Sequence, residues 1–307
     1  MNAVLFGFLP IWVITGLGWV AARHDILGGQ AQHVLGRFAF TFAMPALLFL
    51  AMAGADVTAL LNVGVLVFAL SLLVVFAAGL LVSRWVYRRG RAEQAIGAMA
   101  AGYVNSANLG IPVAVHVLGD TSFVITVALF QMLFVAPVVL VLIDLDVRRD
   151  RRGRAARMLQ LPFRNPIIAA SLAGVAVSAL GWDLPAEATA PLQLLGDAAV
   201  PAALFALGMS LNTRVRPDSA GRAERGLLVA LKIVAQPLLA YAIGHWLFGL
   251  TGHTLFAVVV CAGLPTAQNA FIFASEYRLD TDLARDTVIL STLCSMVSLS
   301  LITWLLV

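Results

Sequence analysis

Long apolar stretches separated by short polar connections make up almost the whole chain. A helix that crosses the hydrocarbon core of a bilayer needs about 20 predominantly apolar residues. Ten stretches reach or approach that length, which predicts an all-α polytopic membrane protein with ten transmembrane helices. The predicted spans cover residues 3–22, 35–54, 62–83, 94–118, 121–143, 165–181, 191–211, 226–249, 253–276 and 286–306.

Composition supports lipid as the solvent of this chain. Of the 307 residues, 61% are hydrophobic and 12% are charged, whereas soluble domains carry roughly 25% charged residues. No stretch is long and polar enough to form a separate soluble domain. The N-terminal apolar stretch has neither a basic region nor a small-residue cleavage site, so it is predicted to be a retained first helix.

The arginines are distributed on one side of this predicted topology. Every arginine follows an odd-numbered span, and the largest group lies in the connection 146–164. The positive-inside rule places such loops in the cytoplasm, with both termini outside. The sequence pI near 9.6 is thereby explained by topology and by attraction to anionic membrane lipid, and no nucleic-acid partner is expected.

Two pairs of landmarks indicate an internal repeat. Pro45 and Pro201 begin similar Pro-Ala-x-Leu-Phe stretches at positions that differ by 156, and Pro112 and Pro265 end Gly-x-Pro motifs that differ by 153. Because five spans is an odd number, a second copy would cross the membrane in the opposite direction. The sequence predicts a first inverted repeat over 1–145, a basic cytoplasmic linker over 146–164 and a second inverted repeat over 165–307.

The Gly-x-Pro motifs predict broken helices in the fourth and ninth spans. Proline removes a backbone donor and glycine weakens the helix further, and a break inside a membrane is tolerated only where protein or cavity water satisfies the freed groups. Matching breaks in two halves are typical of a transporter binding site. The predicted substrate-binding residues are the two prolines and the amides near them: Asn105, Asn108, Pro112, Pro265, Gln268 and Asn269. The alternative is that these amides only satisfy broken backbone and join helices.

Two ionisable residues in predicted spans are further candidates. Lys232, the only lysine, is either a proton or charge-compensating group or a side chain that snorkels to the headgroups. Asp197, four residues before Pro201, is either a similar group or an interfacial residue. The two cysteines lie in apolar runs without metal-ligand spacing, so neither a metal nor a cofactor is predicted.

These motifs resemble the auxin efflux carrier family. The resemblance is carried by Asn105-x-x-Asn108-x-Gly110-x-Pro112 in the fourth span, Leu264-Pro265-x-Ala267-Gln268-Asn269 in the ninth span and Ala199-Val200-Pro201 in the seventh. The resemblance implies crossed broken helices, a scaffold domain and a transport domain, a homodimer and a small organic anion as substrate. The short central linker and the Ala-, Arg- and Leu-rich composition suggest a bacterial member in the cytoplasmic (inner) membrane.

The leading hypothesis is therefore a secondary active transporter, or permease, of a small carboxylate such as a dicarboxylate or an auxin-like acid, working by rocking or elevator motion. One alternative is a cation/proton antiporter on the same fold, although no carboxylate flanks either predicted break. A second is a receptor or channel built on a transporter scaffold. An enzyme is not expected, because the common hydrolase and metalloprotease motifs are missing. Substrate identity, direction of transport and coupling ion are not predicted.

Overall fold

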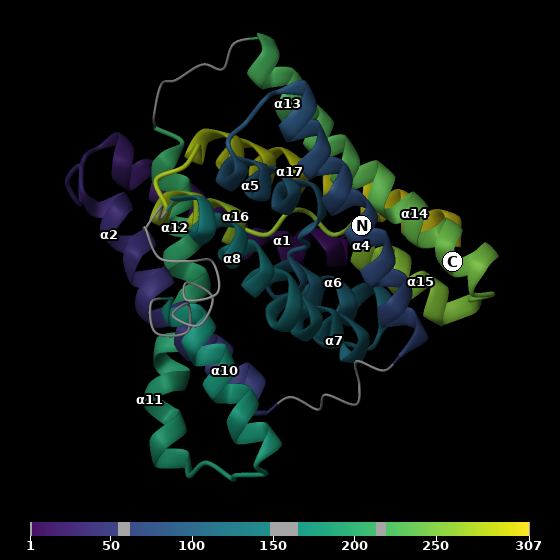
Figure 1. Cartoon of the computed structure of the whole chain (residues 1–307), viewed down its shortest axis with the longest axis horizontal. Helices are drawn as coiled ribbons and strands as arrows, with labels where there is room; N and C mark the ends of the chain where they lie inside the picture. Colours follow the sequence, from purple (N-terminus) through teal and green to yellow (C-terminus); the bar gives the residue numbers. More distant parts are fainter. Residues whose placement is uncertain (1, 55–61, 148–164, 213–218, 307) are drawn as a thin grey trace.

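The computed structural model describes residues 2–54, 62–147, 165–212 and 219–306, and these ranges contain helices but no named strand (Figure 1). Most of the predicted basic linker, residues 148–164, lies outside the described residues, as do Arg214 and Arg216. Each of the ten predicted spans coincides with helical structure. The inverted-repeat relation between the two halves stays a prediction.

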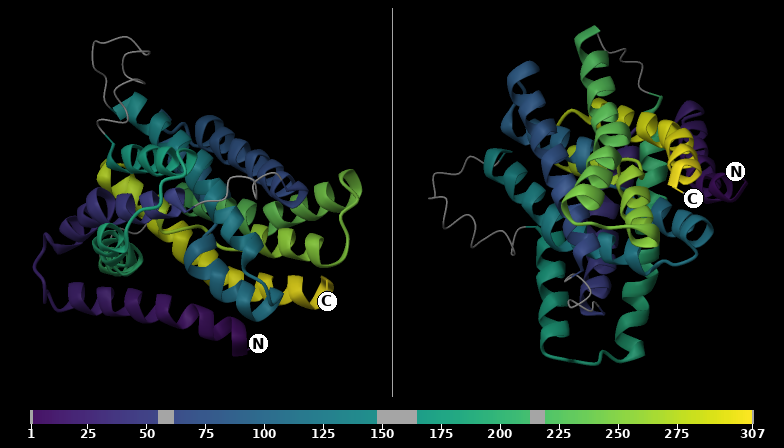
Figure 2. Two further views of the ribbon diagram at one scale, coloured as in Figure 1. Left: turned by 90° about the horizontal axis from the view of Figure 1, so that it is seen from below. Right: turned by 90° about the vertical axis from the view of Figure 1, so that its right-hand side faces the viewer.

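The helices pack as two groups. In the first helix group, α10 (Pro166–Ala179) packs along α3 (Met44–Ala53), and α1 (Asn2–Arg23) packs along α12 (Ala199–Ser210). In the second, α4 (Val63–Leu81) packs along α5 (Arg91–Gly102), and α15 (Gly252–Gly263) packs along α14 (Gln236–Ala242). Figure 1 shows α2, α10 and α11 on the left and α14 and α15 on the right, and in the right-hand view of Figure 2 α10 and α11 extend below the other helices. The first helix group consists of α1 (Asn2–Arg23), α2 (Ala31–Phe38), the π-helical turn η1 (Ala39–Ala43), α3 (Met44–Ala53), α10 (Pro166–Ala179), α11 (Ala186–Asp197) and α12 (Ala199–Ser210).

The second helix group holds the remaining helices and several π-helical turns that continue them. Its members are α4 (Val63–Leu81), η3 (Val82–Val86), α5 (Arg91–Gly102), η4 (Ser106–Gly110), α6 (Ile111–Val113), η5 (Ala114–Leu118), α7 (Ser122–Phe130), η6 (Gln131–Val135), α8 (Ala136–Val147), α13 (Ser219–Ala230), η7 (Leu231–Ala235), α14 (Gln236–Ala242), η8 (Ile243–Leu247), α15 (Gly252–Gly263), α16 (Asn269–Glu276) and α17 (Thr281–Leu306).

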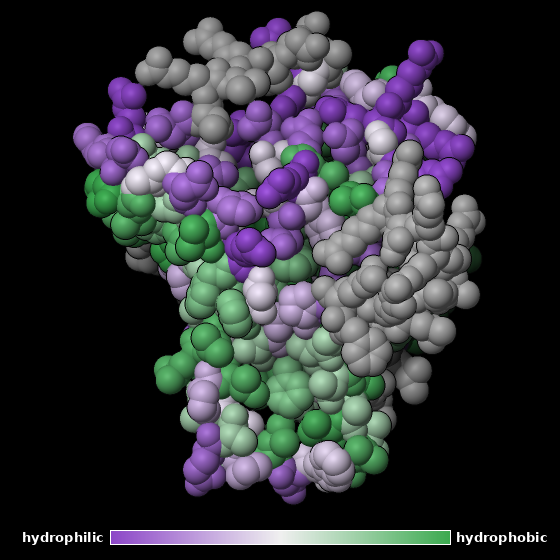
Figure 3. Space-filling model, turned by 60° about the vertical axis from the view of Figure 1, so that its left-hand side comes forward, coloured by the Kyte–Doolittle hydropathy of each residue, from purple (hydrophilic) through white to green (hydrophobic). Residues whose placement is uncertain are grey.

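Several helices have the length and composition of membrane spans. Within the described ranges, 6 helices are long and apolar enough to cross a membrane, and α10 and α15 are shorter apolar helices. Figure 3 shows hydrophobic residues over the middle of one face and hydrophilic residues gathered toward its upper end. This arrangement is that of a multi-pass membrane protein whose middle faces hydrocarbon.

Small residues allow close packing inside the first helix group. A Cβ atom on Gly208 would collide with the backbone carbonyl of Thr15, and one on Gly174 would collide with that of Phe49. Glycines therefore let α12 approach α1 and let α10 approach α3. Such contacts are a main source of helix association where lipid removes the hydrophobic driving force. Close backbone approach thus helps to hold the first helix group together, along with the hydrogen bond from Asn212 Nδ2 to the Ala22 carbonyl at 3.1 Å.

The boundary between the two groups is mostly apolar. Phe40 in η1 meets the rings of Phe273 and Tyr277 edge-on, each at 6.0 Å between centroids. Hydrogen bonds also cross the boundary. Asn165 Nδ2 donates to Tyr277 Oη at 3.1 Å, and Arg285 Nη1 donates to the Ser210 carbonyl at 2.9 Å.

Candidate functional site

Two helices of the second group are interrupted, and their interruptions pair with each other. Helix α5 ends at Gly102 and the helix resumes at Ser106, while α15 ends at Gly263 and α16 begins at Asn269. Between these ends, Val104 and Thr266 form an isolated antiparallel bridge. The Asn105 N–H donates to the Pro265 carbonyl at 2.8 Å, and the Ala267 N–H donates to the Tyr103 carbonyl at 3.1 Å. Each break therefore satisfies backbone groups of the other, as a buried break must.

Only one of the two predicted Gly-x-Pro breaks occurs at its proline. Pro265 lies inside the ninth-span break, but the fourth-span break lies at Tyr103–Asn105, before Gly110-Ile111-Pro112. Pro112 is the second residue of α6, directly after the π-helical turn η4. Such a turn changes the hydrogen-bond spacing, which accommodates a residue without a backbone N–H. The expectation that Pro112 marks the break was therefore wrong, and Pro112 does not belong to the paired segments.

Side chains from neighbouring helices complete the hydrogen bonds of the paired segments. Gln131 Oε1 accepts from the Val104 N–H at 2.8 Å, and Gln131 Nε2 donates to the Val104 carbonyl at 3.1 Å and to Ser106 Oγ at 3.0 Å. On the other side, the Thr266 N–H donates to Ser291 Oγ at 3.0 Å and Thr266 Oγ1 donates to the Ala100 carbonyl at 2.6 Å. Sequence reasoning missed Gln131 and Ser291. A signal for Gln131 was present, because it is a lone glutamine in the apolar span 121–143 and a buried polar side chain needs a hydrogen-bond partner.

Removing the Gln131 amide is expected to destabilise the protein. Gln131→Leu would leave the buried Val104 N–H without a partner, at a cost of about 1–3 kcal/mol, whereas the Val104 carbonyl would keep the hydrogen bond from the Ser106 N–H at 2.9 Å. Thermal unfolding of the detergent-purified protein should show a clear decrease in stability. Gln193→Leu is the matched control, because Gln193 is exposed and bonds only Asp197 among described residues. Equal stability of the two variants would contradict a supporting role for Gln131.

Lys232 lies at the ends of the two helices that precede the breaks. Its side chain is fully buried, and Nζ donates to Gln236 Oε1 and to the Ala262 carbonyl, each at 2.7 Å. Gln236 Nε2 in turn donates to the Gly102 carbonyl at 3.2 Å. The ammonium thus points into the protein rather than toward the headgroups. It sits where carbonyl dipoles at helix C-termini favour a positive charge.

The opposite ends of the breaks face a small hollow between the two helix groups. Its volume is about 40 Å³, and both groups line it, Met44, Ile167 and Val200 coming from the first. From the second group come the four predicted amides, Asn105, Asn108, Gln268 and Asn269, together with Tyr103 and Ser106. The helix N-termini at Ser106 and Asn269 end at this hollow, which favours negative charge there.

The amides around the hollow differ in their existing partners. Asn105 Nδ2 donates to Gln268 Oε1 at 3.1 Å, and both side chains are buried. The side chains of Tyr103 and Asn269 share a hydrogen bond. Asn108 donates its backbone N–H to Asn105 Oδ1 at 3.3 Å, and no described residue bonds its side-chain amide. Asn108 is therefore the amide most available to a ligand.

The structure does not bring the other predicted groups to this hollow. Asp197 is exposed at the end of α11 and accepts a hydrogen bond from Gln193 at 3.1 Å. Neither Asp197 nor Lys232 lines the hollow, and its lining residues include no Asp, Glu, Lys or Arg. Over the described residues, no group of three or more His, Cys, Asp or Glu could hold a metal ion. The hollow is thus a neutral site in which amides and helix N-termini supply the polarity.

Comparisons with known proteins agree with a transport role for this arrangement. The chain is 28% identical over 301 residues to a protein of Methanothermobacter thermautotrophicus named as an uncharacterized transporter, with 95% of each chain covered. It is 27% identical over 298 residues to a Rhizobium meliloti (strain 1021) protein named for malonate transport, covering 95% of this chain and 92% of that one. It is 33% identical over 139 residues to auxin efflux carrier component 6 of Arabidopsis thaliana, covering 43% of this chain and 24% of the plant protein.

The family assignment rests on almost the full length of the chain. The model of the membrane transport protein family matches residues 3–303, a range that includes both interrupted helices and the helices of the first group. The sequence resemblance to auxin efflux carriers is confirmed by the same match and by the plant relatives. With its paired broken helices and its two helix groups, this chain belongs to the membrane transport protein family.

Proposed function

We propose that this protein is a secondary active transporter of a small organic anion, such as a dicarboxylate. The observation that carries the proposal is the hollow between the helix groups, where two helix N-termini and four amides meet. Amide N–H groups and helix N-termini donate to carboxylate oxygens without introducing a fixed charge. The Rhizobium relative named for malonate transport makes malonate the natural first probe.

Lys232 supports this site from the other side of the breaks in the proposed mechanism. Its ammonium balances the partial negative charge of the carbonyls at the ends of α5 and α15, through Gln236 and directly through Ala262. We assign it a charge-compensating role rather than contact with the substrate. This positive charge offsets the negative dipole ends of α5 and α15, and the N-terminal ends at the other side of the breaks remain available for the anion.

Relative movement of the helix groups is part of the proposal. The hollow has room for about one water molecule at its present volume of about 40 Å³, so a dicarboxylate needs the boundary to open. Residues of both groups line it, which means that separation of the groups enlarges it. We propose rocking or elevator motion of the second group against the first, with ten spans in two inverted repeats, in a homodimer.

Binding and transport of organic acids test this function. Purified protein is screened by thermal shift against malonate, other dicarboxylates and aromatic acids, because a ligand of the folded state raises stability with its concentration. Acids that raise the unfolding temperature are then tested for uptake into proteoliposomes under imposed proton and sodium gradients. Cation exchange without any organic acid would instead identify an antiporter, and ligand binding without flux would identify a receptor.

The proposed topology is tested by labelling single cysteines in intact bacterial cells. Cys294 is first replaced by serine, because it is exposed whereas Cys261 is buried. With arginine-bearing loops in the cytoplasm, Asp120→Cys and Glu187→Cys should react with an impermeant thiol reagent added outside. Arg88→Cys should react only after the cells are permeabilised. Reaction of position 88 from outside, with protection of position 120, would reverse the proposed orientation.

A further inference from the structure

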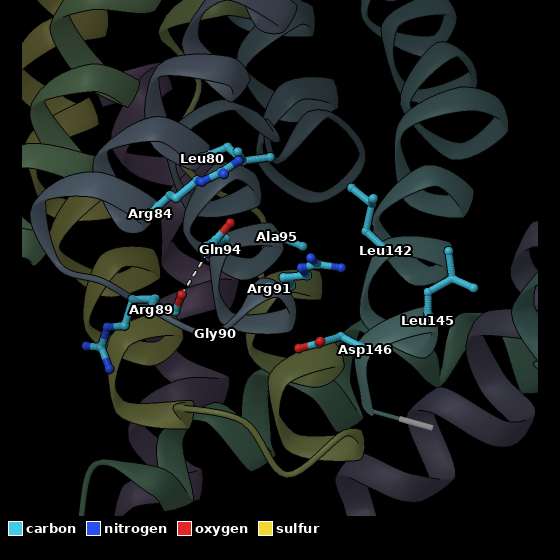
Figure 4. A pocket seen from close by; sticks show the side chains of 10 residues that line it. All are labelled: Leu80, Arg84, Arg89, Gly90, Arg91, Gln94, Ala95, Leu142, Leu145 and Asp146. Carbon is cyan, nitrogen blue, oxygen red and sulfur yellow. Dashed lines mark hydrogen bonds between the residues drawn. The ribbon is translucent and has the colours of Figure 1, made fainter. Parts of the chain in front are cut away.

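A second, larger hollow lies away from the paired breaks, at the end of the second helix group where α5 begins. Its volume is about 860 Å³, within the usual range for small-molecule sites. Figure 4 shows it between the start of α5 and the end of α8, with the Arg91 side chain directed from α5 toward the α8 side and Asp146 directed from α8 toward α5. The transport mechanism proposed above uses none of its residues.

The charges around this hollow are not balanced. Arg89, at the edge of the hollow, already forms ion pairs: its guanidinium lies 2.7 Å from Glu224 Oε2 and 3.2 Å from Asp280 Oδ2. The hydrogen bond to Glu224 raises the pKa of Arg89. Arg84 and Arg91 line the hollow too, and no carboxylate of a described residue lies within ion-pair distance of either. Asp146 accepts the Ala92 N–H at 3.1 Å. The lining thus holds two guanidinium groups without an ion-pair partner among the described residues, and one carboxylate, which caps the start of α5.

The rest of the lining is aliphatic. Leu80, Leu142 and Leu145 form walls of the hollow on α4 and α8, and Leu142 is 37% exposed. Arg84 and Arg91 are exposed as well, so the site is open at the surface. A soluble anion would use the arginines and leave the leucines in contact with water. An amphipathic anion would satisfy both parts of the lining.

We propose that this hollow binds an anionic phospholipid, with its phosphate between Arg84 and Arg91 and the start of its acyl chains against Leu80, Leu142 and Leu145. Guanidinium groups bind phosphate oxygens in bidentate geometry. Basic pockets between membrane helices on the cytoplasmic side are suited to lipid headgroups. The proposal does not depend on the identity of the transported solute.

Lipid binding is measured on the detergent-solubilised full chain by titration with phosphatidylglycerol and, separately, with phosphatidylcholine. The wild type should bind phosphatidylglycerol at least about 10-fold more tightly, and Arg84→Gln or Arg91→Gln should each weaken that binding about 10-fold or more. Arg88→Gln is the matched control, because Arg88 is exposed in the connection between η3 and α5 but does not line the hollow. Thermal unfolding without added lipid verifies that the variants are folded.

Two soluble probes separate a lipid site from a plain anion site. Glycerol phosphate and inorganic phosphate carry the same charged group without acyl chains, so both should compete poorly with phosphatidylglycerol. Leu145→Gln should weaken phosphatidylglycerol binding and leave the weak phosphate binding unchanged. Equal losses in the Arg84, Arg91 and Arg88 variants, no preference over phosphatidylcholine, or phosphate binding as tight as lipid binding would each overturn the proposal.

Discussion

Lys232→Met is expected to lower the free energy of unfolding by several kcal/mol. The substitution keeps the length of the side chain but removes a donor from two buried acceptors, Gln236 Oε1 and the Ala262 carbonyl. Each acceptor left without a partner costs about 1–3 kcal/mol, and the carbonyl ends of α5 and α15 also lose their nearby positive charge. Proteins are typically stable by about 5–15 kcal/mol, so much of the stability would be lost.

The comparison is made by thermal unfolding of detergent-purified variants at equal concentration. Val234→Met is the control, since Val234 lies two residues away in the same π-helical turn but is exposed. A Lys232→Met variant as stable as Val234→Met would show that the ammonium contributes little to the fold. If Lys232→Met folds well but abolishes transport, then Lys232 carries a proton or contacts the solute in another conformation.

Asn108→Ala is expected to weaken binding of the transported anion by roughly 10- to 150-fold, the equivalent of about 1.5–3 kcal/mol for a hydrogen bond to a charged group. The side chain lines the hollow and no described residue bonds it, so its removal costs the free protein little. Thermal-shift titration with malonate, or with the acid that the screen identifies, gives the affinity per folded molecule. Stability without ligand should remain near that of the wild type.

Two further asparagine variants separate binding from folding. Asn212→Ala removes an amide that bonds the Ala22 carbonyl at 3.1 Å, outside the hollow, and should leave the affinity unchanged. Asn105→Ala breaks the buried contact with Gln268 and should lower stability as well as affinity. Unchanged affinity in Asn108→Ala would remove this amide from the site. Lower stability without a change in affinity would mean that the amides only support the broken helices.

The sequence predicted the positions of the helices well, but it predicted few of the contacts between segments that are distant in the chain. The apolar stretches coincide with helices for a simple reason. A segment inside lipid must satisfy its own backbone hydrogen bonds, which a helix does, and about 20 apolar residues are needed for such a helix to cross the bilayer. The polar cluster at Asn105 and Asn108, and that at Gln268 and Asn269, were recognised because polar residues inside apolar spans need a reason. Because each cluster lies beside a predicted break and the two breaks occupy matching positions in the two halves, both clusters were assigned to one site, and all four amides line the same hollow.

The details that failed depend on contacts distant in sequence. Pro112 resembled Pro265 locally, yet whether a proline breaks a helix depends on what surrounds it, and here the η4 turn absorbs the missing donor. The hydrogen bonds of Gln131 join η6 to Val104 in the break after α5, and such a contact between distant segments leaves no periodic signal in the sequence. Lys232 could be placed in a span but not oriented, because a lysine in either direction has the same sequence pattern.

The mostly apolar boundary between the helix groups has a consequence for speed. In the proposed motion, sliding Phe40 past Phe273 and Tyr277 exchanges one van der Waals contact for another and breaks no hydrogen bond. The hydrogen bonds from Asn165 to Tyr277 and from Arg285 to the Ser210 carbonyl must break during the same motion, so they contribute to its energy barrier. Turnover should therefore respond more steeply to substitutions of Asn165, Tyr277 and Arg285, whose side chains make these bonds, than to changes in the size of aliphatic side chains at the same boundary.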